Sequence, residues 1–120
     1  MEVVRGHYDN RPIGIHFISP SFNTFAGNNP SFRVFKLDSQ TKLPLEVETY
    51  YFNLEKANRD DSFAHFEQLH KLTEEYNLKD LRPSEILQLA SNLMIDEQLA
   101  IKYLKNHRAQ GKPSKTISEC

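Results

Sequence analysis

Five histidines are the residues in this chain best suited to bind a metal ion or to transfer a proton near neutral pH. Two of them, His65 and His70, are five residues apart in a segment that we expect to be helical. At about 100° per residue, their side chains would point about 140° apart on a helix. The metalloprotease pattern instead has a spacing of four, with a glutamate next to the first histidine. We therefore interpret His65 and His70 as structural or solvated residues and not as a shared metal site.

The other histidines and the paired acids also have ordinary structural explanations. His16 lies within an apolar run and is typical of a hydrogen-bonded core or wall residue, and His107 suits the C-terminal end of a helix. Glu46 and Glu48 would share one face of a strand, which is typical of a solvated edge. The sequence contains no nucleophile elbow and no glycine-rich phosphate loop. These residues predict no catalytic residue and no metal ligand in this chain.

A polar segment over 21–30 contains the residues that are best suited to binding a ligand. Phe22 and Phe25 lie there among Asn, Ser and Gly residues. Exposed aromatic rings beside amide groups can form one wall of a ligand pocket. The alternative is that both rings tuck under the loop and pin it to a sheet. The residues alone favour this second interpretation without excluding the first.

The elements that must position these residues change in character near residue 60. Short β-branched and alternating runs before that point predict three strands, over 13–18, 32–38 and 47–54. The polar segment 38–41 suits a turn, so an antiparallel hairpin or meander of the last two strands is the simplest arrangement. The two valines at 3–4 are expected to add a short edge strand.

Helical patterns follow in the second half of the chain. Segment 60–62 offers N-cap residues, and an amphipathic helix is predicted after it from the face Phe63, Phe66, Leu69, Leu72 and Tyr76. Pro83 suits the first turn of a second helix, and Asp96 suits the N-cap of a third. The predicted fold class is therefore α+β, with a few antiparallel strands followed by about three helices.

Length and charge exclude several classes of protein. A chain of 120 residues is one domain or part of a larger one, and is too short for a two-domain enzyme. Fifteen basic against sixteen acidic side chains argue against a nucleic-acid partner held by bulk charge. No apolar run approaches the roughly 20 residues of a transmembrane helix, and we expect no signal peptide at the start. One cysteine, Cys120, cannot form an internal disulfide or a cysteine zinc site.

Three segments in succession carry a family resemblance. Residues 11–21 read Arg-Pro-Ile-Gly-Ile-His-Phe-Ile-Ser-Pro-Ser, residues 28–35 read Asn-Asn-Pro-Ser-Phe-Arg-Val-Phe, and residues 48–54 read Glu-Thr-Tyr-Tyr-Phe-Asn-Leu. This order resembles the C-terminal part of acid sphingomyelinase-like phosphodiesterases, within the calcineurin-like metallophosphoesterase superfamily. That family has an Arg-Pro strand, an Ala-Pro-Ser loop, an Asn-Pro-x-aromatic-Arg-Val strand and a Glu-Thr-Tyr strand, followed by helices. The resemblance covers residues 8–113.

The resemblance implies a domain organisation and an activity. Residues 1–58 would be the terminal strands of the phosphoesterase β-sandwich, 59–110 a helical C-terminal region and 111–120 a flexible tail. The intact protein would be a hydrolase of sphingolipid metabolism that cleaves sphingomyelin or a related phosphodiester at a centre of two zinc ions. The Asp, His and Asn ligands of that centre belong to the preceding catalytic domain. This chain is therefore expected to hold no cofactor, to be inactive alone and to have that upstream domain as its partner.

The resemblance also implies substrate-binding residues and a location. Phe25 occupies the position of an aromatic residue that faces the substrate head group, and Asn28 and Asn29 flank the same rim. Cys120 would be half of a disulfide whose other half lies outside this chain. Relatives are mostly secreted or lysosomal, so the same is expected here. The alternative function is a non-catalytic module that binds a protein or a lipid surface through its helices.

Overall fold

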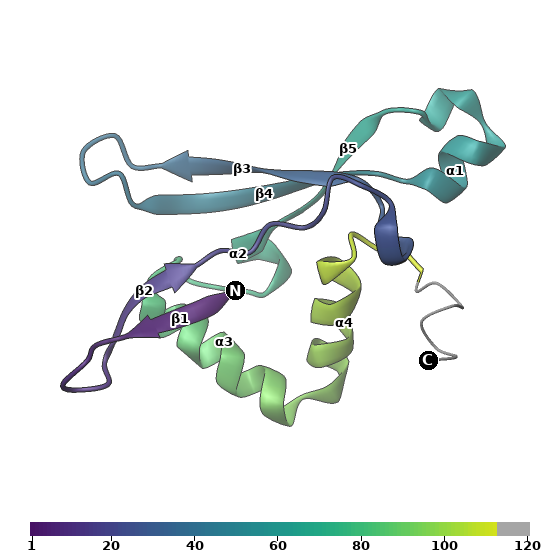
Figure 1. The fold of residues 1–120 in the computed structure, drawn as a ribbon. Coiled ribbons are helices and arrows are strands. Elements are labelled where there is room, and N and C mark those ends of the chain that lie inside the picture. The colour runs from purple at the N-terminus through teal and green to yellow at the C-terminus, as the bar shows by residue number, and fades with distance from the viewer. Residues whose placement is uncertain (113–120) are drawn as a thin grey trace.

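A computed structural model describes residues 1–112 of the chain, as two small antiparallel sheets and several helices (Figure 1). The strands are β1 (Glu2–Arg5), β2 (Pro12–His16), β3 (Ser31–Leu37), β4 (Pro44–Phe52) and β5 (Phe66–Lys71). The α-helices are α1 (Leu54–Arg59), α2 (Leu72–Glu75), α3 (Pro83–Ile95) and α4 (Glu97–His107). Two 3-10 turns, η1 (Phe25–Gly27) and η2 (Asp61–Phe63), complete the described elements. The predicted α+β class is confirmed.

The predicted strands of the first half are confirmed. β1 pairs with β2, with Val3 opposite Ile15, and β3 pairs with β4 in a second sheet. The turn between β3 and β4 forms because the carboxylate of Asp38 accepts hydrogen bonds from the backbone N–H groups of Gln40 at 2.9 Å and Thr41 at 2.8 Å. Local sequence therefore determines the β3–β4 hairpin.

The predicted amphipathic helix across Phe63 to Tyr76 is wrong. Residues Phe66–Lys71 form β5 instead, which pairs antiparallel with β4 and leaves only the short helix α2 after it. The spacing of apolar residues fits a helix, but the free edge of β4 offers a row of unpaired backbone groups that β5 satisfies. A register shift between Thr49 and Tyr50 lets the uneven apolar pattern of β5 fit that edge. Pairing with a neighbouring strand therefore overrides the local periodicity.

The two long helices begin where the sequence predicts. Pro83 is in the first turn of α3, and the carboxylate of Asp96 accepts a hydrogen bond of 3.1 Å from the backbone N–H of Leu99 at the start of α4. The predicted division of the chain between residues 58 and 59 stays a prediction. The predicted tail lies, from residue 113 on, outside the described residues.

The core lies on one side of the β3–β5 sheet. That side, called the inner face here, carries Arg33, Val47, Thr49 and His70. It packs against α2 and the residues that lead into α3, and the buried apolar cluster is Val47, Leu72, Tyr76, Leu81, Ile86 and Leu89. The opposite side, the outer face, carries Phe32, Val34, Glu48, Tyr50 and Phe66. In Figure 1 the β1–β2 hairpin, α3 and α4 all lie on one side of this sheet.

Candidate functional site

The loop over 21–30 separates its two aromatic rings. The side-chain oxygen of Asn23 accepts hydrogen bonds from the Ser21 hydroxyl at 2.8 Å and the Phe25 backbone N–H at 3.0 Å, which shapes the start of η1. Phe22 stacks on Phe66 of β5, with ring centroids 5.7 Å apart. Phe25 is 79% exposed. Phe22 is 66% exposed, so its stacking on Phe66 ties the loop to the rim of the sheet without burying the ring, and the Phe25 ring is available for a ligand or a partner.

The two asparagines after η1 have different surroundings. Asn28 donates from its amide to the carbonyl oxygen of Phe25 at 2.8 Å. Asn29 is buried and joins three distant segments, because its amide donates to the carbonyl of Ala109 at 2.9 Å and accepts from the backbone N–H of Leu54 at 3.4 Å. Both residues line a hollow of about 240 Å³, together with Gly27, Asn53, Glu55 and Lys112. Phe25 lies on the same loop but does not line this hollow. Their role in binding substrate stays a prediction.

The outer face carries an aromatic cluster that sequence reasoning missed. The Phe66 ring lies against Phe22, Phe32 and Phe52 at centroid distances of 5.7, 5.2 and 5.5 Å. Phe32 in turn stacks on Tyr50 at 5.3 Å. Assigning Phe66 to a helix hid this cluster, because its members meet only when β5 pairs with β4. Residues 66–71 have no regular apolar–polar alternation, so no local signal indicated this strand.

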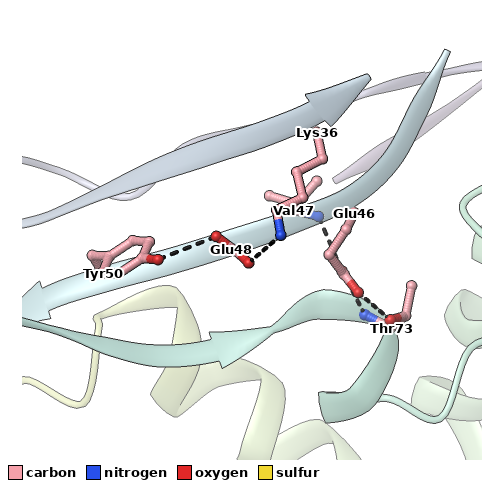
Figure 2. A network of polar contacts seen from close by, with 6 residues as sticks. All are labelled: Lys36, Glu46, Val47, Glu48, Tyr50 and Thr73. Carbon is pink, nitrogen blue, oxygen red and sulfur yellow. Dashed lines mark hydrogen bonds and ion pairs between the residues drawn. The ribbon is translucent and has the colours of Figure 1, made fainter. Parts of the chain in front are cut away.

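Glu48 lies beside the aromatic cluster and is the buried charge of the outer face (Figure 2). It forms an ion pair of 3.0 Å with the amino group of Lys36 and accepts a hydrogen bond of 3.1 Å from the Tyr50 hydroxyl. The Lys36 contact, with help from Tyr50, holds the pKa of Glu48 below its usual range. The prediction of a solvated edge is therefore wrong for Glu48, and a carboxylate held ionised in this way is a poor general acid.

Glu46, two residues earlier on β4, connects the sheet to α2 (Figure 2). Its carboxylate accepts hydrogen bonds from the backbone N–H of Val47 at 3.0 Å, from the backbone N–H of Thr73 at 3.1 Å and from the Thr73 hydroxyl. Burial alone would raise the pKa of Glu46, but the Thr73 and Val47 hydrogen bonds outweigh it and lower the pKa. The carboxylate thereby satisfies a free N–H at the start of a helix, which is a structural role.

The histidines lie in different parts of the described structure. His16 is exposed beside Glu2, 3.6 Å from its carboxylate, so the prediction of a core residue is wrong. His65 precedes β5 and is exposed, whereas His70 is buried on the inner face, and the two share no helix. His107 lies in the last turn of α4, as predicted. Among residues 1–112 there is no group of three or more His, Cys, Asp or Glu residues that could hold a metal ion.

A wide hollow of the described structure is mainly apolar. It has a volume of about 760 Å³, which is in the range of pockets that bind small molecules. It lies between β2 and the β3–β4 hairpin and is lined mainly by Ile13, Ile15, Phe17, Phe35, Leu37, Leu43, Leu45 and Leu81. Asp38, Asp80 and Arg82 are the charged residues that border it. The groove can accept apolar groups, but its lining contains no nucleophile–base pair.

A comparison with models of known protein families identifies the family to which this chain is similar. Residues 12–112 match the family model of the acid sphingomyelin phosphodiesterase C-terminal region. The chain belongs to this family. The resemblance drawn from the sequence segments is thus confirmed. Within residues 1–112, no helix combines the length and the apolar character that a membrane span requires.

Individual relatives that are similar to this chain are named as phosphodiesterases. Human sphingomyelin phosphodiesterase is 32% identical over 94 residues, which cover 75% of this chain and 15% of that protein. Caenorhabditis elegans sphingomyelin phosphodiesterase 1 is 30% identical over 95 residues, or 78% of this chain and 17% of the relative. Human cyclic GMP-AMP phosphodiesterase SMPDL3A is 31% identical over 100 residues, or 77% and 22%. The chain therefore spans less than a quarter of the length of these relatives.

Proposed function

We propose that this chain is the C-terminal region of a phosphodiester hydrolase, and that the intact protein cleaves sphingomyelin or a related phosphodiester. The family match over residues 12–112 carries the proposal. It is supported by relatives whose names are sphingomyelin phosphodiesterase and cyclic GMP-AMP phosphodiesterase. Because the chain spans 15% of the human sphingomyelin phosphodiesterase, the hydrolytic step is assigned to the larger protein.

The two zinc ions that the resemblance implies do not fit the described residues. No group of three or more potential ligands comes together within residues 1–112. We therefore assign the metal centre to an upstream catalytic domain, which would be the partner of this region. The chain by itself is then catalytically inactive, and its own residues perform no chemical step.

The contribution that we assign to this chain is one wall of the substrate site. Phe25 is 79% exposed at η1 and can pack its ring against a choline or nucleoside head group. A phenylalanine has no hydroxyl, so it cannot hydrogen-bond a phosphate. Asn28 and Asn29 would support the same rim, Asn28 by fixing the carbonyl of Phe25 and Asn29 by holding the loop against the segment that follows α4.

The second candidate function is a non-catalytic module that binds a protein or a lipid surface. The observation that favours it is the apolar groove of about 760 Å³, whose lining is well suited to an apolar side chain or an acyl chain. In the first proposal the same surface would pack against the catalytic domain. The two proposals therefore differ in whether a larger protein exists around this region.

The experiment that separates them is the mass of the native protein. An antibody raised to residues 67–81 would capture it from its source cells, and the captured protein would be assayed on sphingomyelin and on a cyclic dinucleotide with and without a zinc chelator. A species much larger than 14.0 kDa that hydrolyses either substrate, and loses activity with the chelator, is the expected result. A native species of 14.0 kDa without activity would overturn the proposal in favour of the binding module.

The rim is tested in that active protein with a pair of exposed phenylalanines. Phe25→Leu is expected to lower kcat/KM by about fivefold to tenfold, because it removes the face of an aromatic ring from the head group. Phe63→Leu is the matched control, since Phe63 is also an exposed ring in a 3-10 turn. Equal kcat/KM values for the two variants would remove Phe25 from the substrate site while leaving the family assignment intact.

A further inference from the structure

A small polar cavity lies under the inner face of the three-stranded sheet. The register places Arg33 of β3 beside Thr49 of β4, and Thr49 beside His70 of β5. Residues of α4 and the end of α2 close the cavity, whose polar lining is Arg33, His70, Tyr76, Tyr103, Asn106 and His107. Its volume is about 20 Å³, which is enough for one particle the size of a water molecule.

The two tyrosines present hydroxyl protons to this cavity. The Tyr76 hydroxyl accepts a hydrogen bond of 3.0 Å from the Asn106 amide, whose own oxygen accepts from Gln110 at 2.7 Å. The Tyr103 hydroxyl accepts from the Met1 amino group at 3.0 Å. Neither hydroxyl donates to an acceptor among residues 1–112. Burial raises the pKa of Tyr76 to about 12 and also raises the pKa of Tyr103, so both keep their protons at neutral pH.

Arg33 adds a positive charge to the same cavity. Its Nε donates to the Thr49 hydroxyl at 3.2 Å and its Nη1 to the carbonyl of Ile18 at 3.1 Å. The Nη2 group donates to no acceptor, and the guanidinium forms no ion pair, within the described part of the chain. Arg33 is half-buried, and this partial burial lowers the pKa of its guanidinium. A half-buried cation without an ion pair can attract an anion into the cavity beside it.

His70 is the other unpartnered group. It is 7% exposed, and neither of its ring nitrogens has a hydrogen-bond partner among the described residues. The nearest acid, Glu75, is paired with Lys102 at 3.1 Å. Burial lowers the pKa of His70, so at neutral pH the ring offers one donor N–H and one acceptor nitrogen. The cavity therefore brings together two tyrosine hydroxyls, a histidine whose ring nitrogens have no partner, and a cation without an ion pair among the described residues.

We propose that this cavity binds one small monovalent anion, of the size of chloride. Arg33 supplies the charge, and the hydroxyls of Tyr76 and Tyr103 and one N–H of His70 supply further donors. A tetrahedral anion such as phosphate is too large for about 20 Å³. A water molecule is the competing occupant, because the two tyrosine oxygens and the free ring nitrogen of His70 can accept its protons, and the bromide experiment below distinguishes the two. The proposal does not depend on the proposed function, because none of these residues belongs to the rim around Phe25.

The site is tested on the full 120-residue chain in chloride and in gluconate at equal ionic strength. Binding of one chloride is expected to broaden the chlorine magnetic resonance line, and to raise Tm by about 3–5 °C at a chloride concentration well above Kd. Crystals grown in bromide are expected to show one anomalous peak between Arg33 and Tyr76. Equal Tm values in the two salts, or a bound water without an anomalous peak, would overturn the proposal.

Matched variants distinguish the cavity from general salt effects. Arg33→Gln removes the charge and is expected to abolish the chloride-dependent rise in Tm. Tyr103→Phe removes one donor with little change in shape, so it tests the site even if Arg33→Gln does not fold. The chloride-dependent rise in Tm of Tyr103→Phe is expected to be at most half that of the unmodified chain. Tyr51→Phe, which removes a hydroxyl outside the cavity, is expected to keep the full rise. A Tyr103→Phe response equal to that of Tyr51→Phe would overturn the proposal.

Discussion

The inner and outer faces of the β3–β5 sheet are built from alternate residues of the same strands, yet they treat polar groups in opposite ways. On the outer face, Glu48 is surrounded by Lys36 and Tyr50, and each of these groups finds its partner within the face (Figure 2). On the inner face, Arg33 and His70 retain donors and acceptors that no described residue satisfies. A pleated strand can therefore carry a self-contained network on one side and an incomplete one on the other.

The difference indicates what each face does. A satisfied network such as that of Glu48 fixes the sheet and has nothing left for a ligand. An incomplete network is costly unless something fills it, since an unpaired buried polar group loses its hydration without return. The inner face is therefore the place to look for a bound ion, and the outer face, with its half-exposed rings, is a surface for packing.

The largest expected difference between the faces comes from shortening one valine on each face to alanine. Val47 is completely buried on the inner face, and Val34 is 40% exposed on the outer face. Val47→Ala is expected to lower the free energy of unfolding by about 2.5 kcal/mol, because it loses buried area and leaves a cavity. Val34→Ala is expected to cost about 0.5 kcal/mol. Urea unfolding followed by circular dichroism measures both, and equal costs would show that something also covers the outer face.

A smaller effect is expected within the aromatic residues. Phe66 contacts three rings of the outer-face cluster, whereas Phe25 is 79% exposed on its loop. Phe66→Ala is therefore expected to cost about 1.5 kcal/mol of unfolding free energy, and Phe25→Ala less than about 0.5 kcal/mol. The near-ultraviolet circular dichroism signal should weaken in the Phe66 variant alone. A comparable loss of stability in Phe25→Ala would mean that its ring is packed and not available to a substrate.

Sequence patterns predicted the elements whose signals are local. The Asp38 turn, the proline at the start of α3 and the Asp96 cap of α4 each act within a few residues, and all three are found in the structure. β5 was not predictable in this way, because residues 66–71 fit a helical spacing and their conformation is decided by the edge of β4, which lies far away along the chain.

The two candidate sites also differ in how far the sequence could predict them. The rim around Phe25 came from a resemblance between sequence segments, and the structure adds that the ring is exposed. The anion cavity has no sequence signature, because Arg33 and His70 are 37 residues apart and meet through Thr49 in two successive strand pairings. A histidine in an expected helix was interpreted as structural or solvated, and only the strand showed that both its nitrogens lack partners.

The inner and outer faces should lose stability in two different pH ranges. The folded state lowers the pKa of His70 from 6.5, chiefly by burial, with smaller influences from Glu75, Arg33 and Lys102. Below pH 6.5 the unfolded chain then binds more protons at this site than the folded chain, so stability falls as the pH decreases. The folded state also lowers the pKa of Glu48 from 4.5, so its contribution is present above pH 4.5 and is lost as the pH falls further.

Two variants show which residue causes the decline in each pH range. Their stability is measured by urea unfolding in chloride-free buffer, so that no bound anion shifts the pKa of His70. His70→Gln is neutral at every pH and is expected to flatten the decline between about pH 6.5 and pH 5 while keeping the lower one. Glu48→Gln is expected to keep the upper decline and to make the lower one shallower, while the lowered pKa values of Glu46, Asp38 and Asp60 maintain the rest of it. If His70→Gln kept the upper decline, the folded protein would accommodate the protonated ring through solvent or a partner, and the inner face would be as self-contained as the outer one.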